Sequence, residues 1–83
     1  MNIKFNKAYL LNKTYYELKR VSYPEGSDYL VITDYNEYCD FYYCKILSFD
    51  KSFYSFVASY YKLDLKQIKK LLGLKPRSKL IIG

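Results

Sequence analysis

Seven basic side chains in the last quarter of the chain have the chemistry to bind phosphate groups. Lys62, Lys66 and Lys70 recur at intervals of four residues, the spacing that brings side chains together on one face of a helix. On such a face like charges repel by roughly 0.2–0.5 kcal/mol per pair, and an anionic partner relieves that repulsion. The predicted phosphate-binding residues are Lys62, Lys66, Lys69, Lys70, Lys75, Arg77 and Lys79.

The same cations also have a purely structural interpretation. A row of charges is typical of a solvated helix face, and the helix dipole stabilises positive charge in the last turn of a helix. Lys69 and Lys70 would stand in such a last turn, just ahead of Gly73 and Pro76. The formal net charge of +6 is compatible with both interpretations, so both stay open.

The stretch from Ile68 to Leu74 resembles the first helix and the turn of a helix-turn-helix motif. Its isoleucine, its paired leucines and Gly73 stand where that motif packs its first helix and turns the chain. Lys69 stands where the motif has a small residue, and only ten residues follow Gly73. We therefore expect contact with phosphates and no sequence-specific reading of bases.

Tyrosines in the middle of the chain are interleaved with acidic residues. Residues 29–33 are rich in β-forming side chains, and alternation along this strand and its neighbours places tyrosines together on one face. Tyrosine is common in protein interfaces, and acidic neighbours favour a basic partner. The predicted protein-binding residues are Tyr15, Tyr29, Tyr35, Glu37, Tyr38, Asp40 and Tyr42.

This tyrosine face has three other interpretations. Its rings could stack on nucleic-acid bases, although the acidic neighbours would repel the phosphates. It could join two copies of the chain in a homodimer. It could also be a second core, hidden beneath residues 2–11, where the pattern fits a strand or a helix and we prefer a strand, or beneath the apolar triplet Leu80 to Ile82, which could form a short edge strand or a helix turn.

Two hairpins are predicted in the first half of the chain. A loop at Pro24 to Gly26 would pair Leu18 with Ile32, and a two-residue loop at Asn36 and Glu37 would pair Ile32 with Phe41. In this register Leu30, Ile32, Phe41 and Tyr43 belong to the core face of the sheet.

Two helices are predicted in the second half. Phe53, Phe56, Val57, Tyr60 and Tyr61 follow the i, i+3, i+4, i+7, i+8 pattern of an amphipathic helix. Asp64 would cap a second helix that ends at Gly73.

We therefore expect a single α+β domain over residues 1–83, with a small antiparallel sheet of three to four strands and two C-terminal helices packed on one face. Residues 1–48 are mainly strands, 50–73 form the two helices and 74–83 form a basic tail.

Several chemistries are excluded or disfavoured by the residues present. The chain has no histidine, and its two cysteines, Cys39 and Cys44, cannot by themselves complete a four-ligand zinc site. No carboxylate pair or phosphate-binding glycine loop stands out, so we expect no enzyme, no metal and no cofactor. The apolar runs are too short to cross a membrane, which makes the cytoplasm the default compartment.

Two function classes follow from these observations. The favoured one is a small non-catalytic binding protein that contacts nucleic acid or a nucleoprotein through its basic C-terminal helix and tail. The alternative is a phage or mobile-element inhibitor that binds a host nucleic-acid-handling protein through the acidic, tyrosine-rich face. Anti-CRISPR proteins act in this way, and the analogy rests on size and composition alone.

Overall fold

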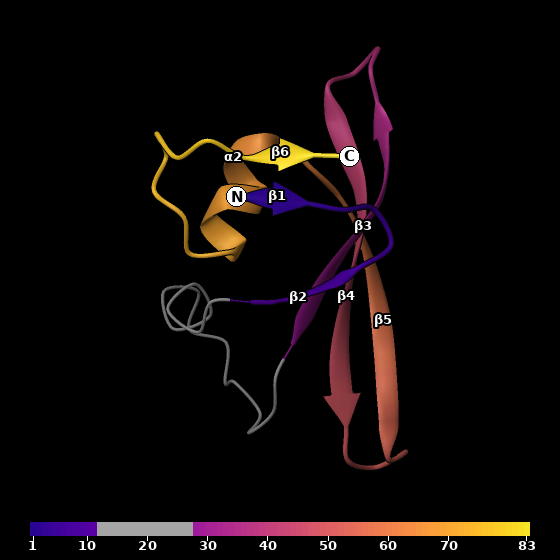
Figure 1. Ribbon diagram of the computed structural model, residues 1–83. Coiled ribbons are helices and arrows are strands. Elements are labelled where there is room, and N and C mark those ends of the chain that lie inside the picture. The colour runs from indigo at the N-terminus through magenta and orange to yellow at the C-terminus, as the bar shows by residue number, and fades with distance from the viewer. Residues whose placement is uncertain (12–27) are drawn as a thin grey trace.

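The computed structural model describes residues 1–11 and 28–83, which form two layers (Figure 1). One layer is an antiparallel sheet with the strand order β2-β3-β4-β5, formed by Ala8–Leu10, Tyr29–Asn36, Phe41–Asp50 and Ser55–Leu63. The other layer contains β1 (Asn2–Ile3), helix α2 (Leu65–Leu71) and β6 (Ile81–Ile82), and it lies on one side of the sheet in Figure 1. None of the described residues belongs to a helix long and apolar enough to span a membrane.

The hydrophobic core lies between these two layers. Leu30 and Ile32 project from β3, and Ile68 projects from α2; all three side chains are 0% exposed. Cys44 of β4 and Ile3 of β1 belong to the same buried cluster. Full burial of such an aliphatic side chain contributes about 1.5–3 kcal/mol. Packing therefore stabilises α2, which at seven residues is too short to be stable alone.

Helix α2 begins and ends where the sequence predicts. The Asp64 carboxylate accepts the Gln67 N–H at 2.7 Å, and the Gln67 side chain accepts the Asp64 N–H at 2.9 Å, which completes a capping box. At the other end Gly73 takes a φ of 71°. Its N–H donates to Lys70 and the Leu74 N–H donates to Lys69, the hydrogen bonds of a Schellman motif.

The other predicted C-terminal helix is wrong. Phe53 lies in the turn that follows β4, and Phe56, Val57, Tyr60 and Tyr61 all lie in strand β5. Valine and aromatic residues are weak helix formers and strong strand formers, and β5 pairs with β4 along all nine of its residues. The apolar stripe therefore does not cover the core face of the sheet; these five side chains are between 45% and 79% exposed.

The register of the β3–β4 hairpin also differs from the prediction. Asn36 pairs with Phe41 across a four-residue turn, so the predicted two-residue loop at Asn36 and Glu37 does not form. A β-bulge between Ile32 and Asp34 then shifts the register, and Ile32 pairs with Cys44. Because a shift of one residue moves side chains to the opposite face, Phe41 and Tyr43 leave the predicted core face.

Residues near the two ends of the chain pair with each other. The prediction of strands in residues 2–11 is confirmed, as β1 and β2, and the triplet Leu80 to Ile82 supplies β6. Strand β1 runs parallel to β6, and the Ile81 N–H donates to the Met1 carbonyl at 3.0 Å. Strand β2 extends the edge of the large sheet beside β3. The predicted pairing of Leu18 lies outside the described residues.

Candidate functional site

Six of the seven predicted phosphate-binding residues lie on one continuous segment. Helix α2 carries Lys66, Lys69 and Lys70, and the loop that follows it carries Lys75, Arg77 and Lys79. Figure 1 shows this loop turning back from the end of α2 toward β6, so the helix and the loop lie together at one end of the layer that contains β1, α2 and β6. We call residues 66–79 the basic segment.

Lys69 fixes the loop to the helix. Its Nζ donates a hydrogen bond to the Pro76 carbonyl at 3.1 Å, and its side chain is half-buried. An ammonium group has three donors, so two remain after this bond. The other five basic residues of the segment are exposed. Lys69 therefore positions the segment, while Lys66, Lys70 and Arg77 present their charges to solvent.

The acidic residue closest in sequence to the basic segment already makes a hydrogen bond. Asp64 is the only acidic residue between Lys62 and Gly83. Its carboxylate accepts the Gln67 N–H as the cap of α2. The side-chain hydrogen bond of Lys69 goes to a backbone carbonyl, that of Pro76, and not to a carboxylate.

Lys62 lies apart from the basic segment. It is the eighth residue of β5, and it pairs with Tyr43 on β4. Its Nζ lies 5.5 Å from the centre of the Phe41 ring, a cation–π contact. The predicted row of three lysines is thus broken at Asp64, and only Lys66 and Lys70 keep the four-residue spacing on a helix.

The predicted tyrosine face is divided by the bulge in β3. Tyr29 lies on the face away from α2, where its ring meets Phe56 at 6.1 Å between centroids. Tyr35 and Tyr42 lie on the α2 side as a cross-strand pair with centroids 4.6 Å apart, and Tyr42 also packs against the core. Tyr15 lies outside the described residues. These tyrosines do not form one surface.

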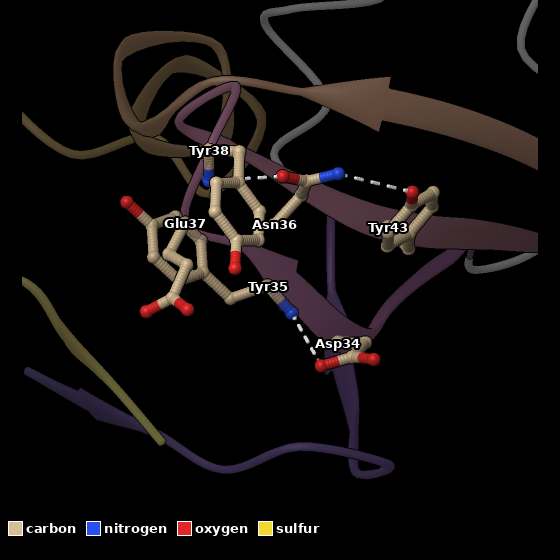
Figure 2. Close-up of a pocket in the computed structure, with 6 residues that line it drawn as sticks. All are labelled: Asp34, Tyr35, Asn36, Glu37, Tyr38 and Tyr43. Atoms are coloured by element: carbon tan, nitrogen blue, oxygen red, sulfur yellow. Dashed lines mark hydrogen bonds between the residues drawn. The ribbon is translucent and has the colours of Figure 1, made fainter.

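The remaining predicted protein-binding residues gather at the turn between β3 and β4. Glu37, Tyr38 and Asp40 belong to the turn itself, and Tyr38 is 92% exposed. The turn borders a shallow depression of about 320 Å³. Its lining residues are Asp34, Tyr35, Asn36, Glu37, Tyr38 and Tyr43 (Figure 2).

Asn36 organises this turn. Its Oδ1 accepts the Tyr38 N–H at 3.0 Å and its Nδ2 donates to Tyr43 Oη at 3.4 Å (Figure 2). The same Oδ1 also accepts the Cys39 N–H at 3.1 Å. The predicted register has Asn36 inside a two-residue loop and Tyr43 in the core, so it misses both roles. The available signal was the ability of an asparagine side chain to bond the backbone two residues ahead.

Tyr35 and Asp40 are coupled across the mouth of the turn. The Tyr35 hydroxyl donates to Asp40 Oδ1 at 2.5 Å. That hydrogen bond, with smaller contributions from burial and from the Asp40 charge, raises the pKa of Tyr35 from 10.0 to about 12. The turn therefore presents the neutral phenol of Tyr35 hydrogen-bonded to the carboxylate of Asp40.

We expect Asp40→Asn to return the pKa of Tyr35 toward 10, because the neutral amide neither attracts the phenolic proton as strongly nor carries a charge. The measurement is a spectrophotometric titration of tyrosine ionisation. Since the folded protein holds this proton more tightly than the unfolded chain, its contribution to stability is complete below pH 10 and falls as pH rises toward 12. Glu37→Gln is the control and should shift the pKa of Tyr35 far less. If the pKa of Tyr35 is unchanged in Asp40→Asn, the coupling between Tyr35 and Asp40 is contradicted.

Comparison with protein-family models, with curated proteins and with solved structures found no significant match. The described residues contain no group of three side chains suited to holding a metal ion. Cys39 is exposed in the turn and Cys44 is buried in the core, and both are free thiols. The function must therefore be inferred from the basic segment and from the acidic turn between β3 and β4.

Proposed function

We propose that this protein is a non-catalytic nucleic-acid-binding protein that contacts phosphates through its basic segment. The observation that carries the proposal is the continuity of that segment, since six cations follow one another along a helix and a loop that Lys69 ties together. Asp64, the only acidic residue between Lys62 and Gly83 in the sequence, accepts the Gln67 N–H as the cap of the helix. Such a concentration of positive charge attracts the closely spaced phosphates of a nucleic-acid backbone.

The arrangement supports contact with the backbone and offers little for reading bases. A helix-turn-helix reads bases with a second helix, and after Gly73 the described chain forms a loop and strand β6 without another helix. Lysines bind phosphates as point charges that tolerate any sequence. In this proposal Lys66, Lys70, Lys75, Arg77 and Lys79 contact phosphates, and Lys69 holds the loop in place.

The test is a salt-titrated binding assay with single- and double-stranded DNA and RNA. The double variant Lys66→Ala/Lys70→Ala should bind more weakly than the parent protein at low salt. The slope of log affinity against log salt should shrink by about two, since each lost phosphate contact removes about one released counterion. No binding of any probe at low salt would overturn the proposal.

A matched control separates this surface from overall charge. Lys7→Ala/Lys51→Ala removes two exposed lysines, one just before β2 and one in the turn after β4, and it lowers the net charge from +6 to +4, as the first variant does. It should keep the parent slope. If both double variants lower the slope equally, the binding is diffuse and the basic segment has no special role.

The alternative, an inhibitor that engages a basic protein through the acidic turn, makes the opposite prediction. Under that hypothesis Tyr35→Ala and Tyr38→Ala abolish capture of the partner while the lysine variants keep it. The structure gives this hypothesis less support, because Tyr29 lies on the face of the sheet opposite Tyr35 and Tyr42.

A further inference from the structure

Strand β5 forms an open edge of the large sheet. It pairs with β4 on one side, and no other described residue pairs with it on the other side. The strand is nine residues long, has neither proline nor bulge, and only its last residue, Leu63, is buried. Natural proteins usually protect such edges with charges, prolines, bulges or very short strands. Lys62 is the only charged residue on β5, so this edge is left ready to pair.

In the described part of the chain, the first third of β5 also lacks support from a third strand. Strand β3 accompanies β4 only as far as Leu47, opposite Tyr29. Beyond that point Ser48 to Asp50 and Ser55 to Val57 form a two-stranded ribbon that extends past the rest of the sheet (Figure 1). Ribbons of two strands are marginally stable in water. The exposed side chains of Phe56 (53%) and Val57 (45%) lie on opposite faces of this ribbon, so a strand added along its edge would contact side chains on both faces.

We propose that the β5 edge pairs with the β5 edge of a second copy of this chain, antiparallel and around a two-fold axis at Ser59. Ser59 is the midpoint of β5, so this axis pairs all nine residues of each strand. The unsupported Ser55 to Val57 of one copy then lies beside Tyr61 to Leu63 of the other, where β5 reaches the core. Each copy thus supplies the third strand that the other copy's ribbon lacks.

The side chains of β5 suit this register. The two-fold axis places Tyr61 opposite Val57, a favourable aromatic and β-branched pair, and the large Tyr60 opposite the small Ala58. Lys62 falls opposite Phe56, and the two lysines of the pair lie at opposite ends of the interface. A parallel arrangement in register would instead set Lys62 against Lys62, so the charge pattern favours the antiparallel pair.

The first test is the mass of the protein in solution. The monomer has a mass of 10.0 kDa, so sedimentation equilibrium should show a concentration-dependent rise to twice that value. A mass that stays at 10.0 kDa at concentrations up to about 1 mM, where even weak association is visible, would overturn the proposal. A mass greater than that of two copies would also overturn the proposal, because a pair related by a two-fold axis uses both β5 edges and leaves none free for a third copy.

The second test uses charge at the two-fold axis. Ser59→Lys and Ser59→Asp each place like charges directly opposite each other, so each variant alone should associate at least about 100-fold more weakly than the parent. An equimolar mixture should restore association as a mixed pair of the two variants. Ser59 is exposed, so both variants should fold, which circular dichroism checks.

The matched control is the same pair of charges at Cys39, a similarly small and exposed residue in the β3–β4 turn. Cys39→Lys and Cys39→Asp should associate as the parent does, alone and mixed. If the two folded Ser59 variants still form homodimers, or if their mixture stays monomeric, the axis at Ser59 is wrong.

Discussion

Ile68→Ala should lower the free energy of unfolding by about 2–5 kcal/mol, the range for removing a large aliphatic side chain from a core. Ile68 is 0% exposed and holds α2 against the sheet. Alanine is the better helix former, so the loss cannot come from helix propensity. Small domains are stable by only about 5–15 kcal/mol, so a large part of the total would disappear. Urea unfolding followed by circular dichroism measures the change.

The same substitution at a surface position provides the control. Ile81 is 65% exposed on β6, and Ile81→Ala should cost less than about 1 kcal/mol. Equal losses at the two positions would mean that α2 does not pack on the sheet as described. The basic segment would then lack the support that keeps its cations together.

Cys44 should resist alkylation at least about 100-fold more strongly in the folded protein than in the unfolded chain. Its side chain is 3% exposed, and burial raises the pKa of its thiol from 9.0 to about 11. Two pKa units lower the thiolate fraction at pH 8 by about 100-fold, and the thiolate is the reactive form. Mass spectrometry of protein treated with iodoacetamide, with and without urea, gives the two rates.

The variant Cys39→Ser isolates this signal, because it removes the exposed thiol in the β3–β4 turn. Labelling of Cys44 at similar rates with and without urea would contradict its burial. The shift also has a consequence for stability: the folded protein holds the thiol proton more tightly, so this contribution is complete below pH 9 and falls as pH rises toward 11.

Helix α2 could be predicted because its signals are local and agree with one another. Asp64 and Gln67 stand at the spacing of a capping box, Ile68 and Leu71 mark the buried side, and Gly73 supplies the left-handed residue that ends the helix. Strand β6 was one of two alternatives for the apolar triplet, and it forms by pairing with β1 at the other end of the chain. Of these two elements, only α2 is specified by neighbouring residues.

Strand β5 could not be predicted from periodicity, because its spacing fits two structures. Phe53, Val57, Tyr60 and Tyr61 lie three and four residues apart as on a helix, and Val57, Ser59 and Tyr61 also alternate as on a strand. Pairing with β4 decides the outcome, and that pairing is not visible in the segment itself. The strand propensity of valine and tyrosine was the better guide.

The two candidate sites also differ in how well the sequence predicts them. The basic segment was predictable because its cations follow one another on a local helix and loop. The tyrosine face was not, because a single bulge near Thr33 transfers Tyr35 to the face opposite Tyr29. One extra residue in a strand reverses every later side chain, and the sequence around Thr33 carries no glycine to mark it.

The pairing of β1 with β6 has a consequence for the order of folding and for how the protein is handled. The β4–β5 hairpin closes a short loop, whereas β1 and β6 meet only after almost the whole sequence has been gathered, at a much greater loss of chain entropy. These terminal strands should therefore be the last to dock and the first to fray. An affinity tag fused to the N-terminus would emerge next to Lys79, whereas the C-terminus lies at the other end of β6 (Figure 1), so a tag at the N-terminus would obstruct the proposed binding surface and a tag at the C-terminus would not.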